Sequence, residues 1–267
     1  MADSDAGAAA RRREPSIPPE VAAPMPEATA PLAKKERAFR ANPFSGDDGS
    51  QPPEFAAAKV VEPPERTPAV VRALVAGRVL VPVLPHPAPA DPMNPHEDDS
   101  CAAPPSILME LPDGRHAMPA FTSIAAMTAW NESARPVPMY GSQAAQAAYE
   151  QGDGLMLLDP GDGAVIIPRP AVWALATGNE WVPAWSDQEL GGVAAAALAG
   201  ISGTLGVALV PGIKAEVAAV VLVEDGLDRH AVETAMNAAA TALSTHPVLR
   251  ERIDSLELVP TTRSGGR

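Results

Sequence analysis

The spacing of hydrophobic positions divides the chain into a first stretch without periodicity and two later stretches in which strands and helices alternate. Through residue 66, apolar positions follow neither a helical nor a strand period, and proline and charged residues are frequent. Such a segment buries too little apolar surface to offset the conformational entropy that folding removes. We therefore expect residues 1–66 to form a disordered arm, with the folded part beginning near Thr67.

Residues 67–186 have the pattern of a small α+β domain, in which strands and helices are mixed and hairpin turns join neighbouring strands. Proline cannot donate a ladder hydrogen bond, so Pro82 marks an edge or a bulge of its strand. The period of the apolar positions and the turn residues between them predict a helix ending at Gly77, a strand over 78–84, a hairpin around Pro112-Asp113-Gly114, a helix over 124–130, a strand over 136–140, a helix over 142–151, a hairpin of strands 155–158 and 164–167, and a helix over 170–178.

Residues 203–260 predict a second unit with the order ββαβ. A first apolar strand ends at Pro211-Gly212, and a second apolar strand follows it. Asp228 is placed to cap a long helix, which ends at His246-Pro247. A short helical turn and a last strand complete the unit. We expect residues 187–202, which are rich in alanine and glycine, to be a connector, and residues 261–267 to be a tail.

The string Phe121-Thr122-Ser123 is the most distinctive local motif. One hypothesis is that its hydroxyls and the N–H groups at the start of the following helix bind a small anion or a carboxylate of a partner. The alternative is a strand-to-helix connection with Phe121 in the core and a hydroxyl as the helix cap.

Aromatic residues point to two candidate partner surfaces. Trp173, Trp181 and Trp185 cluster in the sequence near the end of the first unit, where they either form a ligand or partner surface or pack at a domain edge. Phe39 and Phe44 lie among lysines and arginines in the arm, where they form either a docking island or a few aromatics of a loose segment.

Three strings carry a family resemblance: Val79 to Val83, then Met118 to Ser123 with Trp130 after it, then Gly154 to Gly161. Together they resemble the N-terminal domain of the SseB family, and the region after residue 203 resembles the SseB C-terminal region more loosely. Asp159 stands where that family often has asparagine, and both residues suit a turn. The resemblance implies an α+β fold, and no agreed enzymatic activity goes with the family.

Charge and cysteine content indicate which partners and which cellular compartment to expect for this protein. The formal net charge of −13 disfavours nucleic acid as a partner, because a polyanion is repelled by it. Cys101 is the one cysteine, so no internal disulfide can form. The N-terminus lacks the pattern of a secretion signal, and no apolar run is long enough for a membrane span. We expect a cytoplasmic protein that does not bind membranes.

Catalytic, cofactor and metal motifs are not found in the sequence. The histidines lack metal-ligand spacing, and Asp159-Pro-Gly-Asp-Gly163 lacks the frame of a calcium loop and is typical of a hairpin turn. The leading hypothesis is a non-enzymatic protein-interaction or regulatory module with an unidentified protein partner. The alternatives are a regulatory protein that binds a small molecule or anion, and an enzyme of unrecognised type. The pattern does not indicate an oligomeric state.

Overall fold

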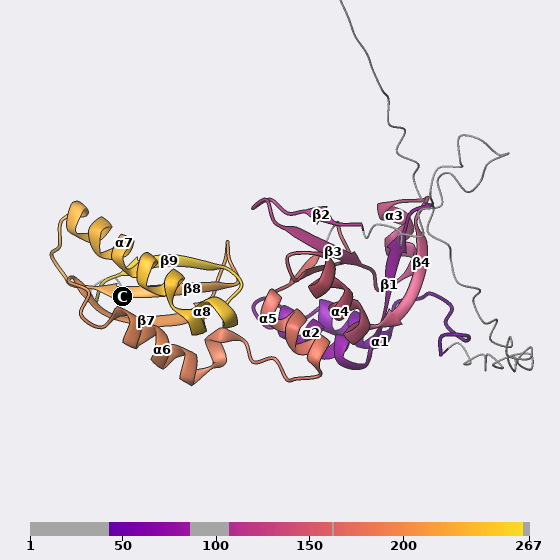
Figure 1. Cartoon of the computed structure of the whole chain (residues 1–267), viewed down its shortest axis with the longest axis horizontal. Coiled ribbons are helices and arrows are strands. Elements are labelled where there is room, and N and C mark those ends of the chain that lie inside the picture. The colour runs from indigo at the N-terminus through magenta and orange to yellow at the C-terminus, as the bar shows by residue number, and fades with distance from the viewer. Residues whose placement is uncertain (1–42, 86–106, 162, 264–267) are drawn as a thin grey trace, which may run out of the picture. The chain divides into compact units, whose positions relative to one another are not determined.

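The computed structural model describes residues 43–85, 107–161 and 163–263, and within them the chain folds as the expected α+β protein (Figure 1). Most of the arm, including Phe39, and the loop that carries Cys101 lie outside the described residues. The elements in chain order are α1 (Pro53–Lys59), α2 (Arg66–Ala76), β1 (Arg78–Val83), β2 (Met109–Glu110), β3 (His116–Ala120), α3 (Ile124–Trp130), β4 (Arg135–Tyr140), α4 (Gly141–Gln151), β5 (Leu155–Leu158), β6 (Val165–Ile167), α5 (Arg169–Thr177), the 3-10 turn η1 (Ala184–Ser186), α6 (Gln188–Leu198), β7 (Thr204–Pro211), β8 (Val217–Val223), α7 (Arg229–Thr245), α8 (Pro247–Arg252) and β9 (Leu256–Thr261).

The N-terminal lobe, residues 44–182, contains a sheet in the order β2-β3-β5-β6. The two hairpins predicted from turn residues are confirmed: β2 pairs with β3, and β5 with β6, both antiparallel. β3 and β5 pair in parallel, because α3, β4 and α4 carry the chain back between them. Gly114 supplies the positive φ, 82°, that the first turn needs.

Pro82 lies in β1 at a position where it removes no ladder bond. β1 pairs with β4 antiparallel, and Leu80 exchanges both of its backbone hydrogen bonds with Phe121 on the side away from β4. Since backbone polar groups alternate along a strand, Pro82 also directs its nitrogen away from β4, toward the unpaired edge. The prediction of an edge position at Pro82 therefore agrees with the register.

The main core of the N-terminal lobe lies between the sheet and helices α1, α2, α4 and α5. Phe55 of α1 is fully buried in this core. The expected arm of residues 1–66 is therefore wrong over its last part, because a helix and its buried phenylalanine lie within it. A single aromatic among prolines has no periodicity, so only the tertiary contact reveals this helix.

Two glycines let the end of α2 and the start of α4 approach closely. The Gly141 N–H donates to the Gly77 carbonyl at 3.0 Å, and a Cβ added at Gly141 would lie 2.2 Å from the Leu74 carbonyl oxygen. Gly77 ends α2 as predicted, but with φ of −75°. It is needed there for space rather than for a left-handed backbone, since an added Cβ would meet the Ala73 carbonyl at 2.4 Å.

The C-terminal lobe, residues 184–263, is built on a sheet in the order β7-β8-β9, with α7 and α8 alongside its strands in Figure 1. One face of β8 shares a core with α6, α7 and α8. The predicted ββαβ order and the Asp228 cap are confirmed, because the Asp228 carboxylate accepts from the Ala231 N–H at 2.8 Å.

The expected connector over residues 187–202 is instead mostly the helix α6. Asp187 caps it by accepting from the Glu189 and Leu190 N–H groups at 3.0 and 3.1 Å. Leu190, Ala194 and Leu198 are buried at helical spacing. Small residues mask this period in the sequence, because alanine contributes little to either face. None of the helices in the described ranges combines the length and apolarity that a membrane crossing needs.

Candidate functional site

Trp173 and Tyr149 are exposed because each lies on the outer side of a helix whose inner side is buried. In α5 the residues flanking Trp173 are buried, and in α4 the buried residues are small ones that leave the ring of Tyr149 outside the core. The two helices pack against each other. Trp173 remains 45% exposed and Tyr149 remains 51% exposed. Large aromatic surface left in water is typical of a binding face.

Tyr149, Trp173 and Trp181 line one cavity of about 550 Å³, which we call the aromatic groove. Its volume lies in the range of ligand and peptide clefts, about 300–1,000 Å³. The groove combines exposed aromatic rings with charged side chains from both lobes: Arg169, Glu180, Arg250, Glu251 and Arg252. Tryptophan, tyrosine and arginine are the residue types that most often dominate the energy of protein interfaces.

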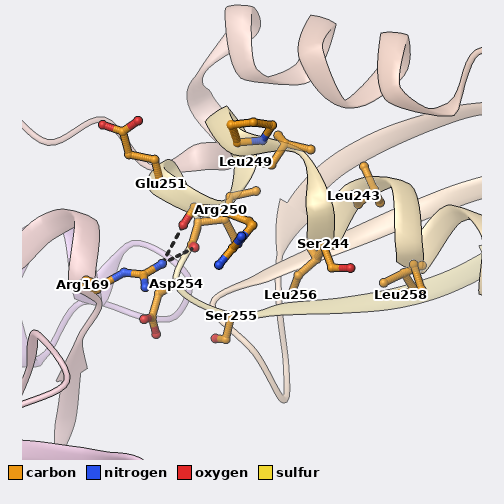
Figure 2. A pocket seen from close by; sticks show the side chains of 13 residues that line it. Arg169, Leu243, Ser244, Leu249, Arg250, Glu251, Asp254, Ser255, Leu256 and Leu258 are labelled. Carbon is orange, nitrogen blue, oxygen red and sulfur yellow. Dashed lines mark hydrogen bonds between the residues drawn. The ribbon is translucent and has the colours of Figure 1, made fainter.

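The three arginines of the groove differ in what they already bind. Arg169 donates from Nη2 to the Arg250 and Ile253 carbonyls at 2.7 and 3.2 Å, and so satisfies the carboxyl end of α8 (Figure 2). Arg252 pairs with the carboxylate of Asp187. The Arg250 guanidinium has no ion-pair partner in the part of the chain that the structure describes, so its positive charge is available to a ligand.

Trp185 stands apart from the aromatic groove, although it contacts Trp181. The two rings meet edge to face with centroids 6.4 Å apart. Trp181 packs against the core of the N-terminal lobe, while Trp185 packs against that of the C-terminal lobe. The structure therefore brings Trp173 and Trp181 to the aromatic groove, whereas Trp185 lines a different cavity, which Trp181 also borders.

Trp185 lines a second cavity, of about 470 Å³, together with Arg115, Glu216 and Asp254. The Asp254 N–H donates to Glu216 Oε2 at 2.6 Å, and Arg115 Nη1 donates to Asp254 Oδ2 at the same distance. Two buried polar atoms in this group, Glu216 Oε1 and Trp185 Nε1, have no hydrogen-bond partner among the described residues. Unsatisfied buried polar atoms are costly, which makes this cavity a second candidate site.

Burial raises the pKa of the Glu216 carboxyl to about 7, because the charged form loses its hydration there. The neighbouring carboxylate of Asp254 acts in the same direction, whereas hydrogen bonds from the Asp254 and Ser255 backbones and the charge of Arg169 oppose it. Glu216 therefore changes charge near neutral pH, unlike an ordinary exposed glutamate.

Phe121 and Thr122 are fully buried. Thr122 belongs to a cluster of polar side chains that fixes the first described segment of the chain. The Thr122 N–H and hydroxyl donate to the two oxygens of Asp159 at 2.7 and 2.6 Å, and Lys59 pairs with the same carboxylate at 2.9 Å. Gln51 donates to the Thr122 hydroxyl oxygen at 2.8 Å. This cluster ties residues 51–59 to the sheet.

Arg78 extends this cluster. It is nearly buried and donates to the Thr122 carbonyl at 2.9 Å and to Asp47 at 2.6 Å. Ser123 caps α3 by accepting a hydrogen bond from the Ala126 N–H at 3.1 Å. This agrees with the alternative in which a hydroxyl of the motif caps the following helix. Anion binding at this motif stays a prediction, and several of the groups it would use are already hydrogen-bonded within the protein.

Phe44 of the expected docking island contacts Tyr140, with ring centroids 5.0 Å apart, and Phe39 lies outside the described residues. Sequence reasoning did not place Arg250, Arg252 or Glu216 in a site. Arg250 lies far along the chain from Trp173, and no local motif surrounds either residue. Only the contact between α5 and α8 brings them together.

The fold and its turns define the N-terminal lobe as a small α+β domain with two hairpins around a parallel strand pair. Residues 55–174, somewhat less than half of the chain, match the family model of the SseB protein N-terminal domain, and this part of the chain is similar to that domain. No match was found among curated proteins or among solved structures. The looser likeness of residues 203–260 to the SseB C-terminal region, and the cytoplasmic location, stay predictions.

Proposed function

We propose that this protein is a non-enzymatic interaction module that binds a segment of a partner protein in the aromatic groove. The observation that carries the proposal is the exposure of Tyr149 and Trp173 side by side with Trp181 around one cavity. Burying the exposed part of two such rings removes apolar surface from water, which is the main source of binding free energy.

The charges of the groove support a protein partner with acidic or amide groups. Arg250 offers planar hydrogen-bond donors that suit a carboxylate or a main-chain carbonyl. The exposed rings and the guanidinium groups that line the groove also favour aromatic or proline side chains in the partner, since both pack on flat surfaces. The net charge of −13 makes a nucleic-acid partner a weaker proposal.

Affinity capture with matched variants tests the proposal. We expect Trp173→Ala to lose a partner that the unchanged protein captures stoichiometrically, and Leu205→Ala to keep it. Leu205 is a suitable control because it is 44% exposed, close to the 45% of Trp173, but lies on β7. A partner that both variants retain would refute the aromatic groove as the binding surface.

A truncation separates the groove from the arm. The cut belongs after residue 42, because removing residues to 66 would also delete α1 and its buried Phe55. If the shortened chain keeps its partner, the groove is sufficient. If capture is lost with the arm while Trp173→Ala keeps it, the Phe39 island is the binding element instead.

The 470 Å³ cavity favours a second candidate function, the binding of a small regulatory molecule. A ligand with one acceptor and one donor would satisfy Trp185 Nε1 and Glu216 Oε1 together. A thermal-shift screen of amino acids and nucleotides tests this candidate, since a ligand at about 100 times its Kd adds about 2.7 kcal/mol. A shift that Trp185→Phe leaves unchanged would count against this cavity.

A further inference from the structure

β9 is the outer strand of the C-terminal sheet, and its backbone leaves an edge open. The Val217 N–H donates to the Ser255 carbonyl at 3.1 Å, and Val217 lies opposite Leu256 in the parallel ladder. In such a ladder Val217 bonds the residues on either side of Leu256, so Leu256 directs its own N–H and C=O away from β8. The alternation directs the polar groups of Leu258 and Pro260 the same way.

Pro260 agrees with this assignment, because a proline in a strand is tolerated where its missing N–H faces an unpaired edge. The open edge therefore offers N–H donors at Leu256 and Leu258 and carbonyl acceptors at Leu256, Leu258 and Pro260. Exposed strand edges of this kind are templates on which an extended segment of another chain can add.

A cavity of about 730 Å³ lies beside this edge, between β9 and the helices α7 and α8. Its apolar lining includes Leu243, Leu249, Leu256 and Leu258, which Figure 2 shows around the opening. Leu256 and Leu258 are only partly buried, although they point toward the helices. Every second side chain of an added strand would enter this cavity, and the others would face the opposite side of the sheet.

Charge indicates what kind of segment fits. In Figure 2, Arg250 reaches from α8 toward Ser255 at the start of β9, whereas Glu251 points away. Of the two acidic residues that line this cavity, Glu251 points away from β9 and Asp254 is neutralised by Arg115 at 2.6 Å. The free charge at this end of the cavity is therefore the positive charge of Arg250, and it complements a carboxylate.

We infer that the β9 edge binds, by strand addition, an extended segment of a partner protein with apolar side chains at alternate positions and an acidic residue that meets Arg250. The inference deepens the proposed function and rests on it, because the 730 Å³ cavity and the aromatic groove share Arg169, Arg250 and Glu251 in their linings. One partner segment can therefore run from the edge of β9 toward Trp173.

The test uses the full chain with a probe strand fused after Arg267. The probe alternates valine and threonine with a glutamate at each end, and a flexible Gly/Ser linker of roughly 20 residues gives it a high effective concentration. Amide hydrogen exchange, read residue by residue by NMR, is the measurement. We expect exchange at Leu256 and Leu258 to slow about tenfold or more, while Glu257 and Val259, already bonded to β8, change little.

Two matched controls make the result decisive. A fused probe of the same composition with its valines adjacent should give no protection at Leu256 and Leu258. Arg250→Ala should reverse most of the protection, and Arg229→Ala, which removes a 91% exposed arginine on α7, should not. Absence of protection with the alternating probe, or equal protection with the control probe, would overturn strand addition. Protection that Arg250→Ala leaves intact would overturn the acidic partner.

Two further outcomes separate this inference from its alternatives. If the Leu256 and Leu258 amides are protected only under conditions in which the molar mass in solution doubles, a second copy of the chain binds the β9 edge. The inference is then wrong. The probe is too short to need the aromatic groove, so Trp173→Ala should leave its protection unchanged. Loss of partner capture in Trp173→Ala then reports on the proposed function, and amide protection reports on the edge.

Discussion

Glu216 makes the stability of this protein depend on pH near neutrality, and Glu216→Gln should remove that dependence. The carboxyl accepts the Asp254 N–H through Oε2, and its other oxygen has no partner among the described residues. Glutamine keeps the shape and one carbonyl acceptor but cannot ionise, so it resembles the protonated acid. The variant therefore isolates the cost of placing a negative charge at this position.

The magnitude follows from the pKa. Burial raises the pKa of Glu216 from the ordinary 4.5 to about 7, so between these values the folded protein holds a proton that the unfolded chain has released. Stability then falls as pH rises, because the native state binds more protons. The difference between these two pKa values, at about 1.4 kcal/mol per pH unit, corresponds to at most about 3–4 kcal/mol.

Urea denaturation across pH measures this effect. The free energy of unfolding of the unchanged protein should fall relative to Glu216→Gln, mostly between about pH 4.5 and about pH 7, with the two proteins closest at the acid end. Glu224→Gln is the control, because Glu224 is exposed at the end of β8. A difference between Glu216→Gln and the unchanged protein that stays constant across this range would refute the argument.

Three further substitutions and one control test the packing, all by urea denaturation. Phe55→Ala should cost about 3–5 kcal/mol, because the ring is fully buried, and a cost below about 1 kcal/mol would contradict the placement of α1. Asp159→Asn should cost about 2 kcal/mol by leaving a half-buried ammonium unpaired. Gly141→Ala should cost about 1–3 kcal/mol, since its Cβ would meet the Leu74 carbonyl, whereas Gly191→Ala, in open space within α6, should stabilise by about 0.5–1 kcal/mol.

Local chemistry explains which parts of the fold the sequence predicts. The turns at Gly114 and after Asp159, the cap at Ser123 and the cap at Asp228 all act within a few residues, so their signals survive without tertiary information. The elements built on them occur where the pattern places them. Hairpins and capped helices were therefore predictable together with the α+β class.

Long-range contacts explain what the sequence does not predict. α1 forms because Phe55 inserts under α2, and nothing in its proline-rich surroundings indicates that contact. α6 is masked by small residues that give no clear period. The candidate sites are harder to predict, because Trp173 and Arg250 line the same cavity only through packing between the lobes. The tryptophan cluster was found by residue type alone, and Trp185 proved to face a different cavity.

The ion pair between Lys59 and Asp159 joins residues that are 100 positions apart. A ribosome adds about 5–20 residues per second, so Lys59 is added to the chain roughly 5–20 s before its partner Asp159. Thr122, which shares the Asp159 carboxylate, emerges in between. The first described helix is therefore made early and cannot complete its ion pair until much later, and during that interval Phe55 is a hydrophobic surface that a chaperone at the exit tunnel can bind.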